Sequence, residues 1–203
     1  MDERTFLKLS RYLCKHRGYY RVGGYNPLTG LAWASRSKNG GMFHIDPITC
    51  QPAYNYVFPQ VTGFQEGLAC VRNDSGFWQY HIRPDGQPAY ANRFLSVGLF
   101  FEGLADAIDE KGQFHITADG QPAYANRFEH VGHFRCQLAQ AEDASGHFHI
   151  KPDGRPAYKL RGLENGPFAE QGLAWTKIVK MVDDKKRIVK VTINTLGEIV
   201  TEK

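Results

Sequence analysis

Short stretches in which apolar and polar residues alternate recur along this chain, each bounded by glycine, aspartate or serine. One kind begins Gly-Leu-Ala, and the other has the order aromatic, histidine, isoleucine. Alternation with a period of two, enriched in aromatic and β-branched residues, is typical of β-strands. A turn cluster separates the two kinds, so we expect each pair to form an antiparallel hairpin. The first kind lies at residues 30–33, 67–71, 103–107 and 172–175, and the second at 43–45, 80–82, 114–116 and 148–150.

The hairpins belong to a tandem repeat. The hexapeptide Asp-Gly-Gln-Pro-Ala-Tyr returns almost unchanged, and its glycines, Gly86, Gly120 and Gly154, are spaced 34 residues apart. A period of this length indicates one small supersecondary unit stacked on copies of itself. The Asp-Gly pair predicts a tight turn with glycine at positive φ, and the proline predicts a short or edge strand after it. The copies occupy residues 85–90, 119–124 and 153–158, and a shorter one occupies 50–54.

We therefore predict an all-β protein built as a tandem array of β-hairpins or meanders, with about 34–36 residues per repeat. A single hairpin is marginal in water, so each unit must pack on its neighbour. We expect an open, solenoid-like array, because an open array tolerates a variable number of repeats. A propeller-like closure is the alternative, since about 35 residues nearly suffice for one blade.

The N-terminal segment, residues 1–24, departs from the repeat. Its apolar residues recur at helical spacing, and Asp2 stands where an N-cap is expected. We predict a short amphipathic helix that covers the first repeat, with a membrane-surface helix as the alternative because its other face is basic. The apolar positions are Phe6, Leu9 and Leu13.

The rest of the chain divides into two parts. Residues 25–176 hold the tandem β-repeats. Residues 177–203 read as a divergent last repeat that carries a basic hairpin at 177–190. A solvated hairpin tip is the expected reading of that cluster, and contact with phosphate or an acidic surface is the alternative.

Composition limits the class of protein. Hydrophobic residues make up 42% and charged residues 23%, and no apolar run approaches the ~20 residues that span a bilayer. The N-terminus lacks the apolar core of a secretory signal, and the four cysteines form no CxxC pair, so we expect reduced thiols and a cytoplasmic protein. A net charge of +4 is too mild to predict a nucleic-acid partner.

Parts of the repeat match a known consensus. Phe-x-Glu-Gly-Leu-Ala occurs at 64–69 and 100–105, and residues 193–200 read as strand, glycine turn and strand. In these segments the chain resembles the WG-containing β-repeat family of mostly bacterial proteins, over about residues 25–203. The family's Trp-Gly-Tyr is replaced by a histidine-bearing triplet, so this is a divergent variant. The resemblance implies a β-repeat fold and carries no common activity. The replaced triplets are 79–81, 113–115 and 147–149.

One histidine recurs in four repeats and is the strongest candidate for chemistry. Its neighbours point to the opposite face of the strand, so the four side chains should face the same way. With three strands per repeat, equivalent histidines would lie about 14 Å apart, too far to share a metal ion. A structural histidine bound to a turn or to the next unit, and a row facing a ligand, are the readings left open. These residues are His44, His81, His115 and His149.

Arg93, Arg127 and Arg161 also recur, each three residues after the tyrosine of the hexapeptide. They either bind a neighbouring carbonyl or carboxylate, or extend the histidine row toward an anionic partner. No nucleophile, phosphate or metal motif accompanies them, so we expect no catalytic residues, metal or cofactor, and no enzyme. The prediction is a non-catalytic interaction module with a protein or peptide partner. A small His- or metal-dependent enzyme, or a binder of an anionic ligand such as nucleic acid, glycan or headgroup, is the alternative.

Overall fold

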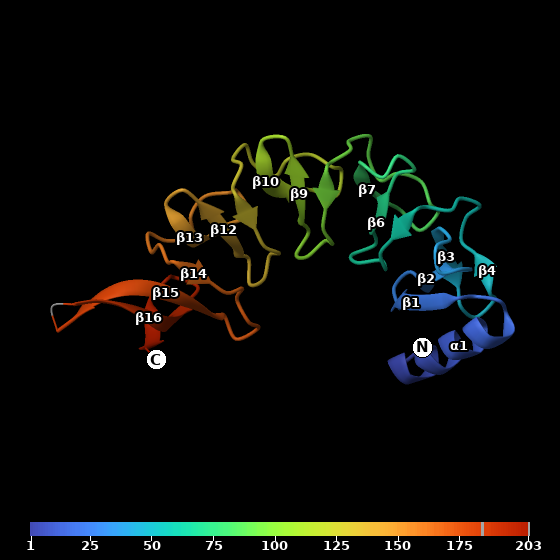
Figure 1. The fold of residues 1–203 in the computed structure, drawn as a ribbon, viewed down its shortest axis with the longest axis horizontal. Helices are drawn as coiled ribbons and strands as arrows, with labels where there is room; N and C mark the ends of the chain where they lie inside the picture. Colours follow the sequence, from blue (N-terminus) through green and yellow to red (C-terminus); the bar gives the residue numbers. More distant parts are fainter. Residues whose placement is uncertain (184, 203) are drawn as a thin grey trace. The chain divides into compact units, whose positions relative to one another are not determined.

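The computed structural model describes residues 1–183 and 185–202 and begins with helix α1 (Glu3–His16), followed by short β-strands (Figure 1). The prediction of an all-β protein with a short N-terminal helix is confirmed, and the strands form several small sheets. The chain divides into two compact units, Met1–Leu99 and Phe100–Lys203. Within the described residues, no helix is both long and apolar enough to cross a membrane.

The first unit holds a four-stranded sheet in the order β1-β2-β3-β4 and a three-stranded sheet in the order β5-β6-β7. All neighbouring strands in them pair antiparallel. The strands of this unit are β1 (Arg21–Asn26), β2 (Leu31–Ser35), β3 (Met42–Asp46), β4 (Gln51–Pro52), β5 (Gln60–Val61), β6 (Ala69–Arg72), β7 (Gln79–Ile82) and β8 (Ser96–Val97).

The second unit holds the β9-β10 hairpin, a sheet in the order β11-β12-β13, and a sheet in the order β14-β15-β16-β17. Its strands are β9 (Ala105–Asp109), β10 (Gly112–Ile116), β11 (His130–Val131), β12 (Ala139–Asp143), β13 (Gly146–Ile150), β14 (Glu164–Asn165), β15 (Leu173–Val182), β16 (Lys185–Asn194) and β17 (Ile199–Glu202).

Each repeat forms the predicted hairpin, and a third strand is added to it. The Gly-Leu-Ala strand pairs with the aromatic-His-Ile strand, so that Ala107 faces Phe114 and Ala105 faces Ile116. The small alanines leave room for the large side chains opposite, and all four are buried. The third strand, however, comes from the linker before the hairpin, as β5, β11 and β14 do. The segment after the proline makes isolated bridges, such as Ile116 with Pro122, because proline has no N–H for the ladder.

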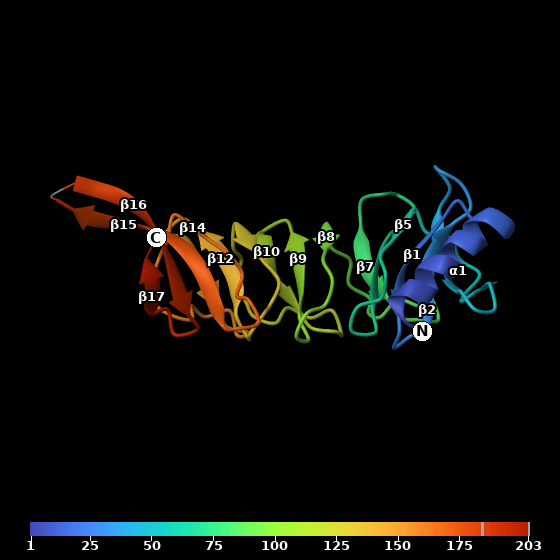
Figure 2. The same ribbon diagram turned by 90° about the horizontal axis from the view of Figure 1, so that it is seen from below.

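Helix α1 covers the first sheet, as predicted. Asp2 is the N-cap, and its carboxylate accepts hydrogen bonds from the Thr5 backbone N–H at 2.9 Å and the Thr5 hydroxyl at 2.8 Å. Phe6 stacks on Tyr25 with ring centroids 5.0 Å apart. Leu13 is fully buried in a core that it shares with residues of β2 and β3. Figure 2 shows the helix lying across β1.

Candidate functional site

The four repeated histidines are buried. His44, His81 and His115 are 0% exposed and His149 is 1% exposed. The prediction of a surface row that binds a partner is therefore wrong for the histidines. Alternation along a strand predicts an exposed face only where one side of the sheet meets solvent. Here Phe114 and Ile116, on the face opposite His115, are buried as well. Both faces of each hairpin are covered by protein.

Each histidine ring is held between a tyrosine hydroxyl and a backbone carbonyl. In the third repeat, His115 Nδ1 lies 2.5 Å from the Tyr124 hydroxyl, and Nε2 lies 2.9 Å from the Gly132 carbonyl oxygen. A carbonyl only accepts, so Nε2 carries the proton and Nδ1 accepts from the tyrosine. The same arrangement joins His44 to Tyr54 and Thr62, His81 to Tyr90 and Gly98, and His149 to Tyr158 and Gly166.

Burial keeps these rings neutral. Desolvation lowers the pKa of His44, His115 and His149 from 6.5 to about 4, while the carbonyl bound to each ring opposes that shift in part. Burial also raises the pKa of Tyr124 above its ordinary value. A neutral histidine and a neutral tyrosine with every polar atom bonded form a structural pair, which was one of the readings left open by the sequence.

The tyrosine of this pair also joins one repeat to the next. The turn glycine of the following repeat lies against the tyrosine ring: a Cβ on Gly86 would be 2.5 Å from Tyr54, and a Cβ on Gly154 would be 2.5 Å from Tyr124. Gly197 meets Tyr158 in the same way. These glycines are at φ +80°, +76° and +79°, so the turn requires glycine for its backbone and for its packing.

The repeated arginines stack on the aromatic residue that precedes each histidine. The distances from guanidinium carbon to ring centroid are 3.7 Å for Arg93 on Tyr80, 3.5 Å for Arg127 on Phe114 and 3.8 Å for Arg161 on Phe148. They also donate to carbonyls of their own linkers. The ring-stacking faces and several N–H groups of these guanidiniums are therefore used within the fold. The arginines offer little free surface to a binding partner.

The structure offers no metal centre among residues 1–183 and 185–202: no three His, Cys, Asp or Glu side chains gather as ligands there. All four cysteines are free thiols, and Cys70 is the buried one among them.

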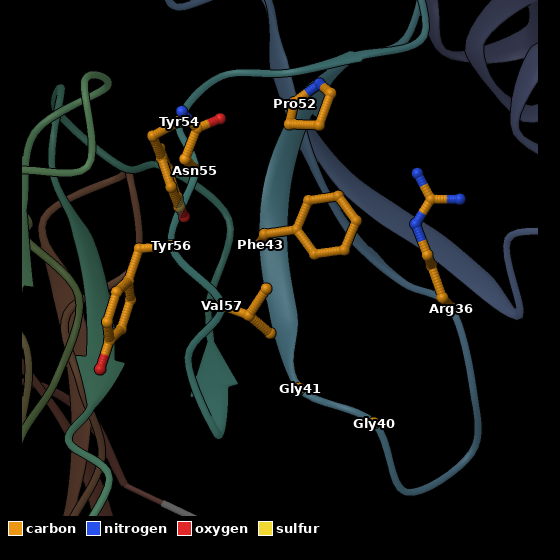
Figure 3. A pocket seen from close by; sticks show the side chains of 9 residues that line it. All are labelled: Arg36, Gly40, Gly41, Phe43, Pro52, Tyr54, Asn55, Tyr56 and Val57. Atoms are coloured by element: carbon orange, nitrogen blue, oxygen red, sulfur yellow. The ribbon is translucent and has the colours of Figure 1, made fainter.

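A cavity of about 360 Å³ lies in the first unit, between the β2–β3 loop and the segment that follows β4 (Figure 3). Phe43 forms its floor, with Pro52 and Tyr54 beside it, and Val57 and Arg36 stand at its edge. The Tyr54 wall is fixed, because its hydroxyl is bonded to His44 Nδ1 at 2.7 Å. Volumes of about 300–1,000 Å³ with mainly apolar walls are usual for small-molecule sites.

This cavity exists because the first repeat lacks the stacking arginine. The position three residues after the hexapeptide tyrosine holds Arg93, Arg127 or Arg161 in the later repeats and Val57 in the first. Val57 is short and 52% exposed, so it leaves open the place that a guanidinium takes over Tyr80, Phe114 and Phe148. The equivalent ring here is Phe43.

Arg36 supplies positive charge at the edge of the cavity. Its guanidinium carbon lies 4.8 Å from the Tyr19 ring centroid and 5.8 Å from that of Phe43. It is exposed and makes no ion pair within the described part of the chain. Its two aromatic neighbours hold the side chain beside the cavity while leaving its N–H groups available.

The surroundings of the cavity are basic. Residues 1–50 contain eight Lys and Arg against three Asp and Glu, whereas residues 51–176 contain ten against fourteen. Two further hollows on this unit are lined by Arg11, Lys15, Arg21 and Lys38, with no carboxylate among their lining residues. The first unit thus presents a positive field toward small anions.

Sequence reasoning missed this site. The signal was present in the alignment of the repeats: Val57 breaks the arginine period, and a basic loop, residues 36–41, precedes the aromatic of the same repeat. The glycine pair Gly40-Gly41 belongs to the same loop. Both glycines line the cavity (Figure 3), and a Cβ on Gly41 would clash with Val57 Cγ1, so glycine is needed for the loop to approach Val57 this closely.

No protein-family model and no curated protein matches this sequence. Among solved structures, Kluyveromyces lactis Hsv2 matches with a TM-score of 0.45 and 12% identity, over 90% of this chain and 73% of that one. Regucalcin from Agrobacterium tumefaciens, described as a calcium-binding protein, matches with a TM-score of 0.37 and 10% identity, over 89% and 73%. Likenesses this distant bring no ligand or activity to this chain, and membership of the WG-containing family stays a prediction.

Two expectations are corrected by these matches. The open, solenoid-like array is wrong, because the structures found are β-propeller proteins. The expectation of a non-catalytic protein-interaction module is corrected as well: the matches, Hsv2 and a calcium-binding regucalcin, give it no support. The physical basis of the first error is that a period of 34 residues and a hairpin unit suit both architectures equally.

Proposed function

We propose that the first unit binds a small organic anion with a flat apolar body, in the cavity between Phe43 and Arg36. The observation that carries the proposal is the exchange of the stacking arginine for Val57. A planar group entering there would lie over Phe43 as the guanidinium of Arg127 lies over Phe114, 3.5 Å from the ring centroid. The Arg36 guanidinium beside it would then meet a carboxylate or phosphate on the ligand.

Charge selects among planar ligands. An aromatic face by itself attracts cations, so a guanidinium or ammonium ligand would suit Phe43 alone. Arg36, which lies beside the same cavity and makes no ion pair within the described residues, repels such a ligand and attracts an anion. The excess of basic over acidic residues in 1–50 acts in the same direction.

Phenyl phosphate is a suitable probe, with phenol, benzylamine and inorganic phosphate as comparison ligands in NMR or calorimetric titrations. We expect phenyl phosphate to bind with a Kd on the order of 1 mM or tighter, and the other three more weakly. Arg36→Gln should weaken phenyl phosphate by about tenfold, because a charge-assisted hydrogen bond contributes about 1.5–3 kcal/mol. Binding of phenol should change little in this variant.

Val57→Arg provides the sharpest test. The new side chain should stack on Phe43, fill the cavity and abolish binding, although it adds a positive charge. Val200→Arg is the matched control, since Val200 is 51% exposed and lies on β17 in the other unit. Tighter binding of phenyl phosphate by Val57→Arg would mean that charge alone attracts the anion, and would overturn the proposal of a stacking site.

A cytoplasmic location is part of the same proposal. Four cysteines in a chain of 203 residues, none of them joined in a disulfide, are in keeping with a reducing compartment.

A further inference from the structure

Strands β15 and β16 continue beyond the sheet to which they belong. They pair with each other from Leu173–Asn194 at one end to Val182–Lys185 at the other. Strand β14 pairs only with Thr176 and Lys177, and β17 only with residues 191–193. Residues 178–182 and 185–189, here termed the distal ribbon, therefore have no third strand within the described part of the chain, and they project from their sheet (Figure 1, Figure 2).

One face of the distal ribbon carries three aliphatic side chains together with Lys186, which is opposite Met181. Val179 and Ile188 are directly opposite each other, and Met181 is the next residue on the same face. They are 51%, 66% and 58% exposed. An isolated two-stranded ribbon is barely stable in water, and three aliphatic side chains without a cover make it less so. Such an exposed cluster marks a contact surface.

The distal ribbon is also basic. Residues 177–190 contain six Lys and Arg against two Asp. At its base, Lys177 pairs with Glu164 at 2.8 Å and Lys180 with Glu202 at 2.6 Å. Toward the tip, the exposed side chains of Lys185, Lys186 and Arg187 form no ion pair within the described residues. The net positive charge is therefore concentrated where the aliphatic side chains are.

We propose that the distal ribbon docks on the surface of an anionic lipid bilayer. Val179, Met181 and Ile188 would enter the boundary between headgroups and acyl chains, while the basic side chains of the tip meet the lipid phosphates and carboxylates. Apolar burial and attraction between basic residues and anionic lipids combine in this mode of binding. The charge complementarity and the aliphatic face are both needed, and the ribbon supplies both on one projecting element.

Nucleic acid fits the same charge less well. Proteins that grip single strands place aromatic rings under the bases, and the distal ribbon contains no aromatic residue. Trp175 lies nearer the base of β15, where the Lys190 ammonium covers its ring at 4.3 Å. Aliphatic side chains gain nothing from a phosphate–sugar backbone, and they gain from lipid.

Cosedimentation with phosphatidylcholine vesicles containing 25 mol% phosphatidylserine tests the proposal. We expect binding to these vesicles, weak binding to pure phosphatidylcholine, and partial release in 0.5 M salt. The triple variant Val179→Ser, Met181→Ser, Ile188→Ser should reduce binding at least tenfold. The triple variant Lys185→Gln, Lys186→Gln, Arg187→Gln should do the same.

Matched controls keep the result interpretable. Leu196→Ser removes an aliphatic residue that is 69% exposed on a turn of the same unit, and Lys151→Gln with Lys159→Gln removes charge from it. Both should bind vesicles like the unchanged protein, and circular dichroism should show that all variants are folded. Arg36→Gln should also bind vesicles normally, since the distal ribbon does not depend on the cavity of the first unit.

Vesicle binding that survives both triple variants would overturn the proposal. A second outcome would also overturn it: the protein does not bind vesicles, but it binds a 30-mer oligonucleotide, and this binding is lost in the charge variant and kept in the serine variant. Loss of vesicle binding in the serine variant, with the oligonucleotide ignored, is the expected result.

Discussion

Tyr124 lies so close to Gly154 that a Cβ on the glycine would be 2.5 Å from the tyrosine ring, and the two residues belong to successive repeats. The hydroxyl of the same tyrosine is bonded to His115 in its own repeat. One side chain thus fixes a hairpin internally by its polar end and joins it to its neighbour by its ring. Since a repeat of this size cannot bury its own core, such joints determine the stability of the array.

Gly154→Ala should lower the free energy of unfolding by about 2–4 kcal/mol, because a positive φ and a steric clash act together. Gly76→Ala is the control: φ is +77° there and +76° at Gly154, but nothing lies within 4 Å of a Cβ at Gly76. It should cost about 1 kcal/mol. Urea unfolding should show that Gly76→Asn is more stable than Gly76→Ala, whereas Gly154→Asn remains as unstable as Gly154→Ala. If asparagine restores stability equally at both positions, packing against Tyr124 is unimportant.

Tyr124→Phe should destabilise the protein by about 1–3 kcal/mol, because His115 Nδ1 becomes a buried acceptor without a donor. Tyr12→Phe, on the exposed side of α1, should change the free energy of unfolding by less than about 0.5 kcal/mol. Thermal unfolding followed by circular dichroism measures both. Similar melting temperatures for the two variants would show that the hydroxyl is dispensable.

Stability should fall as the pH is lowered from about 6.5 to about 4. The unfolded chain takes up protons on its histidines near pH 6.5, whereas His44, His115 and His149 resist protonation in the fold until about pH 4. Protons thus bind the unfolded state preferentially in this window, and each of these residues should cost about 2 kcal/mol between pH 7.5 and 5.

Urea unfolding at pH 7.5, 6 and 5 measures this dependence. Leu196→Ser, at an exposed position that carries no titratable group, is the control and should leave the slope unchanged. His115→Gln should lower by about one the number of protons that the chain takes up on unfolding. A free energy of unfolding that stays constant from pH 7.5 to 5 would contradict the assignment of the buried rings as neutral.

Arg127→Lys should cost about 1–2 kcal/mol despite the retained charge. The guanidinium stacks on Phe114 and pairs with Asp109 at 2.8 Å, and an ammonium cannot do both in that geometry. Arg135→Lys, at an exposed position of the same unit, is the control and should be neutral. Equal melting temperatures of the two variants would indicate that the stack contributes nothing.

The sequence predicted the hairpins, their turns and the N-terminal helix because these depend on local alternation, on Asp2 and on the Asp-Gly pairs. It did not predict where the histidines point. Alternation places His115 and Phe114 on opposite faces, but whether each face is covered depends on linkers and on neighbouring repeats. The spacing of nine residues between His115 and Tyr124 recurs in two further repeats, yet spacing alone does not reveal a hydrogen bond.

The cavity was missed for a related reason. It arises from a residue that is missing from the pattern, Val57, combined with a loop residue outside the pattern, Arg36. Repetition draws attention to the residues that recur, whereas this site depends on a difference between repeats. Comparing each repeat with the consensus, position by position, would have marked Val57 as the exception.

The joint between Tyr124 and Gly154 has a consequence for how such a chain can change over generations. Both halves of the joint occupy fixed positions of the repeat, and the repeat that holds Gly154 and Tyr158 shows both, with Gly154 against Tyr124 and Tyr158 against Gly197. An in-frame duplication of one 34-residue segment would therefore create a complete new joint without any compensating mutation. Loss of a segment would likewise leave the remaining tyrosine facing a glycine. The exception is the first repeat, whose Val57 is not reproduced by copying a later segment, so a gain or loss of middle repeats would leave the proposed ligand site single.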